Sequence, residues 1–214
     1  MKPGSTVFLI TLAVAALTGC AARSPNHSAN PPCCAASESP AIFTDKSLYQ
    51  TESRWTTDQG TPVKLGQLAG RPQIVAMFFA NCQFACPIIV NDMKRIEAAL
   101  TPDLRARVGF TLVSFDTKRD TPAALAAYRL AHALPGESWT LLRGEPDDVL
   151  ELAALLGLKF KADANGQFAH SNMITILNGQ GEIVHQLIGL NQDIQETVRL
   201  LRQLSPEART RDSR

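Results

Sequence analysis

The chain has almost no charge imbalance, few aromatic residues, and no hydrophobic run long enough to cross a bilayer. Its 21 lysine and arginine residues nearly balance 20 aspartate and glutamate residues, which leaves a net charge of +1, and aromatic residues make up 6% of the 214. Nucleic-acid binding needs a concentrated basic field with interleaved aromatic side chains, so this composition argues against a nucleic-acid partner. The apolar run at 7–17 is too short for a membrane span but fits the hydrophobic region of an export signal.

The first 19 residues are predicted to be a lipoprotein signal peptide. Lys2 gives a basic start, and the apolar run ends in Leu17-Thr18-Gly19-Cys20, which resembles a bacterial lipobox. In such signals the peptide is cut before the cysteine, so the sulfur of Cys20 would carry a diacylglycerol. An ordinary secretory signal and a buried helix are the alternatives. The lipoprotein interpretation predicts a location in the bacterial cell envelope, anchored to a membrane and facing the periplasm or another extracytoplasmic space.

Three further segments are predicted from composition. Residues 20–40 contain the lipidated Cys20 and a spacer rich in Ser, Pro, Ala and Asn, which cannot bury enough surface to fold. Residues 41–204 have the size of one globular domain, and residues 205–214 form a polar tail.

The order of strands and helices predicts an α/β domain with a thioredoxin-like fold. Buried strands at 73–80 and 108–115 alternate with helices, a short strand follows at 139–142, and a hairpin at 173–188 precedes the last helix. This order implies a mixed central sheet with helices on both faces and an N-terminal hairpin at 56–65. Residues 162–166 are predicted to be a loop.

Cys82 and Cys86 stand where the strand at 73–80 turns into a helix. Residues four apart on a helix lie about one turn from each other, so both sulfurs can face one small volume. Such a pair can bind a soft metal ion or close a redox disulfide. Pro87 suits the first turn of the helix, and the helix N-terminus favours the thiolate form that ligation needs.

Among the four histidines, His170 is the best candidate for a third ligand. It comes just before the strand at 173–177, whose entrance in a thioredoxin-like sheet lies beside the cysteine loop. Two thiolates and one imidazole suit Cu(I) and can also hold Cu(II), whereas zinc would need a fourth donor. From chemistry alone, copper binding and a redox disulfide between Cys82 and Cys86 both remain open.

Three segments resemble the Sco/SenC family: 79–87 with C-x-x-x-C-P, 114–122, and 169–173 with the histidine. The resemblance implies a membrane-tethered, thioredoxin-like copper protein that helps assemble the CuA centre of cytochrome c oxidase. Cys82, Cys86 and His170 would be its copper ligands. The implied partners are cytochrome c oxidase subunit II or another cuproenzyme, and another copper chaperone. Asp116 matches a family segment and is the residue expected to hold the ligands in position without binding the metal itself.

Two departures from the family pattern are visible. Gln83 stands where many members have proline, and Ala169 stands where many have an acidic residue before the histidine. The second departure removes a partner that would orient the imidazole, so copper affinity or redox poise is expected to differ from the family norm.

Cys33 and Cys34 lie outside this core pattern. They are adjacent in the spacer beside Pro31-Pro32, so they are a candidate secondary metal site or simply a tolerated pair.

The sequence predicts a metallochaperone rather than an enzyme with turnover. The alternative is an extracytoplasmic thiol–disulfide oxidoreductase that reduces the cysteines of a partner's copper site. Thioredoxin-type enzymes use C-x-x-C and a cis-proline, but here the spacing is longer and Ser171-Asn172-Met173 contains no proline. A peroxiredoxin-like peroxidase is disfavoured because Phe79 occupies the position of the threonine in that pattern.

Overall fold

The computed structural model describes residues 43–164 and 167–205. The predicted signal peptide, the lipidation site Cys20, the spacer with Cys33 and Cys34, and tail residues 206–214 lie outside this part of the chain. Within the described part, no helix is both long and apolar enough to span a membrane.

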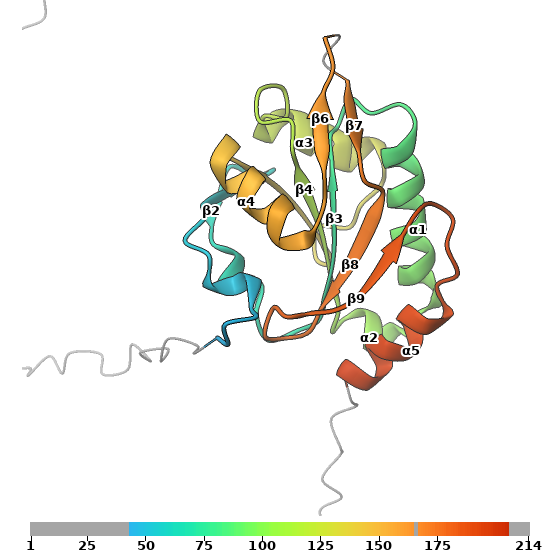
Figure 1. The fold of residues 1–214 in the computed structure, drawn as a ribbon. Helices are drawn as coiled ribbons and strands as arrows, with labels where there is room; N and C mark the ends of the chain where they lie inside the picture. The colour runs from blue at the N-terminus through green and yellow to red at the C-terminus, as the bar shows by residue number, and fades with distance from the viewer. Residues whose placement is uncertain (1–42, 165–166, 206–214) are drawn as a thin grey trace, which may run out of the picture. The chain divides into compact units, whose positions relative to one another are not determined.

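A seven-stranded mixed sheet forms the centre of the domain (Figure 1), in the order β2-β1-β5-β4-β3-β8-β9. The three inner strands β3, β4 and β5 are parallel, while the strands outside them run antiparallel to their neighbours. Every residue of β3 and β4 is buried, because helices cover both faces of the sheet. The bounds are β1 Trp55–Thr57, β2 Pro62–Val63, β3 Gln73–Phe78, β4 Gly109–Ser114, β5 Trp139–Gly144, β8 Met173–Leu177 and β9 Ile183–Ile188.

Helices α2, α3 and α4 each begin at a proline. Thr121 caps α3 by accepting a hydrogen bond from the Ala124 amide, Pro122 follows it, and Pro146 opens α4 in the same way. Figure 1 shows α1 and α4 on opposite sides of the sheet. The helices are α1 Ala85–Ala99, α2 Pro102–Arg105, α3 Pro122–Ala131, α4 Pro146–Leu156 and α5 Gln195–Leu204, with 3₁₀ turns η1 Leu48–Gln50 and η2 Leu65–Leu68.

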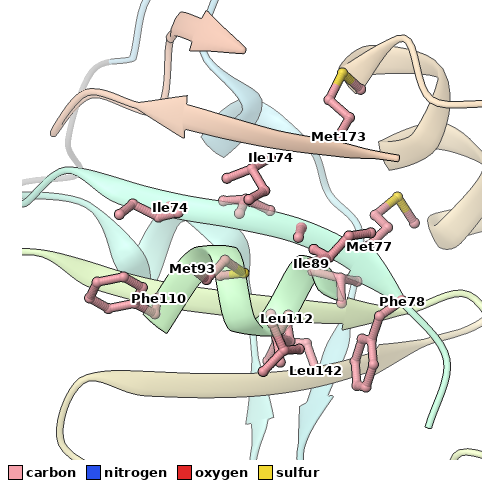
Figure 2. Close-up of a cluster of buried hydrophobic side chains, with 14 of the residues drawn as sticks. Ile74, Met77, Phe78, Ile89, Met93, Phe110, Leu112, Leu142, Met173 and Ile174 are labelled. Atoms are coloured by element: carbon pink, nitrogen blue, oxygen red, sulfur yellow. The ribbon is translucent and has the colours of Figure 1, made fainter. Parts of the chain in front are cut away.

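Helix α1 is fixed to the sheet by large apolar side chains. Ile89 and Met93 point from α1 toward the strands and lie among Ile74, Phe110 and other core residues (Figure 2), and both are essentially fully buried. Burying each such side chain contributes about 1.5–3 kcal/mol. This packing fixes the N-terminus of α1 at the carboxyl end of β3, where the cysteines lie.

The hairpin formed by β6 (Phe160–Ala162) and β7 (Phe168–His170) is a separate two-stranded sheet that the sequence analysis did not predict. A loop was expected over residues 162–166, and the strands on either side of it were missed. Each strand has only three residues, too few for a periodic pattern to stand out. The hairpin matters for function because His170 is the last residue of β7.

Candidate metal centre

The two cysteines lie between the end of β3 and the first turn of α1. The Cys82 amide donates to the Phe79 carbonyl at 3.2 Å, which closes the turn after the strand. Helix α1 then begins at Ala85, so Cys86 lies in its first turn and Pro87 occupies a position where no intrahelical donor is needed. Cys86 is fully buried and Cys82 is partly exposed, and both are free thiols.

His170 approaches the cysteines from the β6–β7 hairpin. Its Nε2 lies 3.7 Å from Cys86 Sγ, and its Nδ1 lies 3.0 Å from the Ser171 carbonyl oxygen. A carbonyl oxygen can only accept, so this contact assigns the proton to Nδ1. In the neutral imidazole, Nε2 therefore keeps its lone pair and directs it toward the sulfurs, as a metal ligand requires.

The three side chains offer donor atoms that all lie within 4.8 Å of one another. A metal about 2.3 Å from each of three donors would hold them about 4 Å apart. Only a small contraction would thus be needed to bind an ion. Among the described residues, this is the only group of three or more His, Cys, Asp or Glu side chains so arranged.

Burial and the helix N-terminus act on different sulfurs. The Cys86 amide donates to Cys82 Sγ at 3.3 Å, so the first turn of α1 supplies a hydrogen bond to Cys82. Burial raises the pKa of the Cys86 thiol well above its ordinary value. The helix N-terminus and a bound cation were expected to favour the thiolate, and at Cys86 desolvation by burial opposes that effect. A metal ion must displace a proton from this thiol when it binds.

Two phenylalanine rings contact the imidazole, and two more pack against them. Phe115 lies 5.2 Å and Phe79 6.3 Å from the His170 ring, measured between ring centroids. Phe160 stacks on Phe115 at 5.1 Å, and Phe168 contacts Phe79 at 5.1 Å and Phe115 at 5.0 Å. This aromatic cluster restricts water and limits the orientations that His170 can take.

The carboxylate that contacts the cysteine loop belongs to Asp120, not to Asp116. Asp120 Oδ2 accepts hydrogen bonds from the Ala80 amide at 2.9 Å and from the Ser114 hydroxyl at 2.5 Å. Burial raises the pKa of Asp120. Asp116 instead pairs with Arg119, and the described residues show no hydrogen bond from it to the cysteines or the histidine. Sequence could place both aspartates near the strand end, but not tell which one turns toward the loop.

The orientation of His170 does not depend on an acidic neighbour. Ala169 is exposed, and the carbonyl of Ser171 holds Nδ1. A backbone acceptor can thus do what the missing acidic residue was expected to do.

The fold and the site together define a class: a thioredoxin-like domain with a Cys-x-x-x-Cys pair at the head of the first long helix and a histidine facing it. The family model described as SCO1/SenC matches residues 44–205, three quarters of the chain. The chain belongs to this family, which confirms the resemblance seen in its motifs.

Known relatives agree with this assignment. A protein from Stutzerimonas stutzeri, named as a candidate copper-binding protein, is 26% identical over 143 residues, which cover 65% of this chain and 68% of the relative. The structure of Bradyrhizobium japonicum ScoI with copper bound is matched with a TM-score of 0.58 and 19% identity, over 71% of this chain and 96% of that one.

A third relative links the fold to thiol chemistry. BsSco, described as having a disulfide switch and as a member of the Sco family of cytochrome c oxidase assembly proteins, is matched with a TM-score of 0.61 and 20% identity. The match covers 71% of this chain and 90% of that chain. These likenesses confirm the predicted thioredoxin-like fold with its mixed central sheet.

Proposed function

We propose that this protein is a copper metallochaperone that delivers copper to, or helps assemble, the CuA site of cytochrome c oxidase. The observation that carries the proposal is the convergence of Cys82, Cys86 and the unprotonated Nε2 of His170 within 4.8 Å. Two sulfurs and one imidazole nitrogen form a soft donor set that suits Cu(I) and can also hold Cu(II). Family membership and copper-binding relatives support copper as the cargo.

Copper transfer would proceed by ligand exchange. Cys82 is the more exposed of the two sulfurs, so an incoming thiolate would displace Cys82 first and the buried Cys86 last. Each new bond from copper to the acceptor would replace one that breaks, and the bond to His170 would be exchanged for an acceptor ligand in the same way as the two bonds to sulfur. When Cys86 leaves the metal it takes up a proton, and the raised pKa of this buried thiol favours that step. Burial of Cys86 therefore assists release of the cargo.

Thiol–disulfide exchange is a second candidate function, favoured by the pairing of one exposed and one buried thiol. The Cys82 thiolate would attack a partner disulfide and form a mixed disulfide. Cys86, once deprotonated, would then attack Cys82, release the partner as a dithiol and leave a Cys82–Cys86 disulfide. The partner gains two electrons and the protein loses two. The raised pKa of Cys86 slows the second step, which makes this the weaker candidate.

We further propose that the protein is a lipoprotein of the bacterial cell envelope, anchored through Cys20 with its domain on the extracytoplasmic side. The apolar run at 7–17 and the following Leu-Thr-Gly-Cys support this location. Cytochrome c oxidase subunit II, or another cuproenzyme, is the proposed recipient of copper.

A Cu(I) titration against a competing chelator tests the copper site. The full chain, reduced and anaerobic in detergent, is compared with Cys82→Ser, Cys86→Ser and His170→Ala. We expect one tightly bound copper, which both serine variants lose and the alanine variant holds about 10–100-fold more weakly. Weak copper binding in the parent protein, together with rapid reduction of a partner disulfide, would refute the chaperone function and support the oxidoreductase function.

Cys33→Ser combined with Cys34→Ser is the control for this titration, because it removes two thiols from the chain while leaving Cys82 and Cys86 in place. We expect its copper stoichiometry and affinity to equal those of the parent protein. A second copper equivalent that disappears in this double variant would assign a metal site to the spacer pair.

A further inference from the structure

A cavity of about 490 Å³ adjoins the aromatic cluster, because Phe115, Phe160 and Phe168 line it. It is bounded by the start of α4, the β6–β7 hairpin and the segment that follows β4. Figure 1 shows these elements gathered at the end of the sheet where β6 and β7 project. Its walls are mainly apolar, and Phe115, Phe160, Phe168, Pro146, Val149 and Leu150 supply most of the apolar surface.

The cavity and the metal centre share side chains. Phe115 and Phe168 line the cavity, and the Phe115 ring also lies 5.2 Å from that of His170. Phe160 stacks on Phe115 and is paired with His170 across the hairpin. A group seated in the cavity would therefore be one ring away from the proposed copper ligand.

The rim of the cavity is apolar and open to a partner. Leu150 lines it from α4 and is 56% exposed, whereas Leu152 and Leu156 of the same helix are buried. Leu155, on the same helix, is also exposed but does not line the cavity. Exposed apolar groups around a concave site are typical of protein-binding surfaces.

Exposed lysines lie on the side of this surface that includes His170. Lys118 lies on the rim, and Lys159 and Lys161 line a shallower hollow that includes His170. All three side chains are exposed, and within the described residues none has an ion pair. Two acids and two bases line the cavity itself, because Asp116 pairs with Arg119 and Asp163 offsets the charge of Lys118. The excess of positive charge comes from Lys159 and Lys161, which line the hollow that includes His170. Charge complementarity therefore favours an acidic partner.

We propose that this cavity is the docking site for the copper-accepting protein, which inserts an aromatic or branched aliphatic side chain carried on an acidic segment. The proposal rests on the proposed chaperone function and adds the surface that recognises the recipient. The cavity volume lies within the range of about 300–1,000 Å³ that protein pockets use for ligand groups, so one large side chain fits. Docking there would bring the acceptor's thiolates beside His170 and the exposed Cys82.

The test measures copper transfer from the full chain, in detergent, to the copper-free soluble domain of subunit II of cytochrome c oxidase. Leu150→Asp places a negative charge on the cavity rim, and Leu155→Asp makes the same change elsewhere on α4. We expect the second-order transfer rate to fall at least 10-fold for Leu150→Asp and to stay within twofold of the parent for Leu155→Asp. Cu(I) affinity should be unchanged in both, because neither side chain contacts the metal centre.

Charge reversal supplies the second arm. The triple variant Lys118→Glu, Lys159→Glu and Lys161→Glu should transfer copper at least 10-fold more slowly at low salt, and the rate should no longer fall as salt is added. Lys46→Glu, an exposed lysine on the N-terminal segment, is the control and should behave as the parent protein.

The outcomes separate the two proposals. If the parent protein transfers copper and Leu150→Asp matches Leu155→Asp, the docking site is wrong while the chaperone function stands. A fall in Cu(I) affinity in Leu150→Asp would also overturn it, since the cavity would then support the ligands rather than a partner. If the parent protein binds copper but transfers none, the proposed acceptor is wrong and the docking site falls with it.

Discussion

Truncating Phe115 is expected to weaken the fold and the copper site together, because this ring joins the core to the imidazole. Phe115 is 3% exposed and contacts the rings of Phe79, Phe160, Phe168 and His170, all with centroids within 5.5 Å. Replacing a buried phenylalanine by alanine costs about 3–5 kcal/mol. We expect the free energy of unfolding to fall by about 3 kcal/mol in Phe115→Ala, because the new space opens onto the existing cavity and water can enter it.

The effect on copper follows from the orientation of His170. Once Phe115 is removed, the Ser171 carbonyl and the Phe79 ring still contact the imidazole among the described residues, but the ring with the nearer centroid is gone. Residues that orient a metal-binding histidine typically change affinity by about 10–100-fold when mutated. The Cu(I) affinity of Phe115→Ala should therefore fall by a factor in that range.

Urea unfolding and the Cu(I) competition titration measure the two effects separately. Phe115→Leu is the matched control, because leucine refills most of the volume and should cost about 1.5 kcal/mol or less, with little change in copper affinity. A stability loss below about 1 kcal/mol in Phe115→Ala would contradict the packing argument. A normal loss of stability with unchanged copper affinity would show that the aromatic cluster does not orient His170.

Two further variants test buried charge. Because burial raises the pKa of Asp120, the native state binds this proton more tightly than the unfolded chain, so its contribution to stability is fully present below about pH 4 and is lost as the pH rises through the folded-state pKa. Asp120→Asn keeps an oxygen that accepts from the Ala80 amide. We expect its stability to change less with pH than that of the parent protein, and to be the higher of the two at pH 7. A stability–pH curve parallel to that of the parent would refute the raised pKa of Asp120. Arg129 forms a two-point ion pair with Asp58 at 2.5 and 2.8 Å, with both side chains largely buried, so Arg129→Met should cost about 3–5 kcal/mol in urea unfolding, and adding Asp58→Asn should restore part of it.

The motifs predicted most of the metal centre because their geometry is local. Only three residues separate Cys82 from Cys86, and a strand followed by a helix with Pro87 in its first turn fixes where that pair lies. The β6–β7 hairpin could not be predicted in this way, because its position depends on contacts with distant residues. Phe160 and Phe168 contact Phe115, which directly follows β4, and a sequence window cannot reveal contacts between residues that are 45 or more positions apart.

The two aspartates after β4 also show that the sequence does not reveal which distant groups a side chain contacts. Asp116 and Asp120 lie four residues apart after the same strand, and the resemblance to the family singled out Asp116 as the residue that would support the ligands. The tertiary packing turns Asp116 toward Arg119 and Asp120 toward the Ala80 amide. Likewise the sequence placed Cys86 at a helix N-terminus, where a thiolate is favoured, but could not show how deeply that sulfur is buried.

By itself, the sequence determined the family, the thioredoxin-like order of elements and the identity of three candidate copper ligands, because spacing and hydrophobic pattern are properties of the chain. The tertiary structure decided which nitrogen of His170 faces the sulfurs, which thiol resists ionisation, and that a cavity flanked by lysines adjoins the site. Hydrogen-bond direction, desolvation and surface shape depend on residues brought together from distant parts of the chain, so they exist only once the domain has folded.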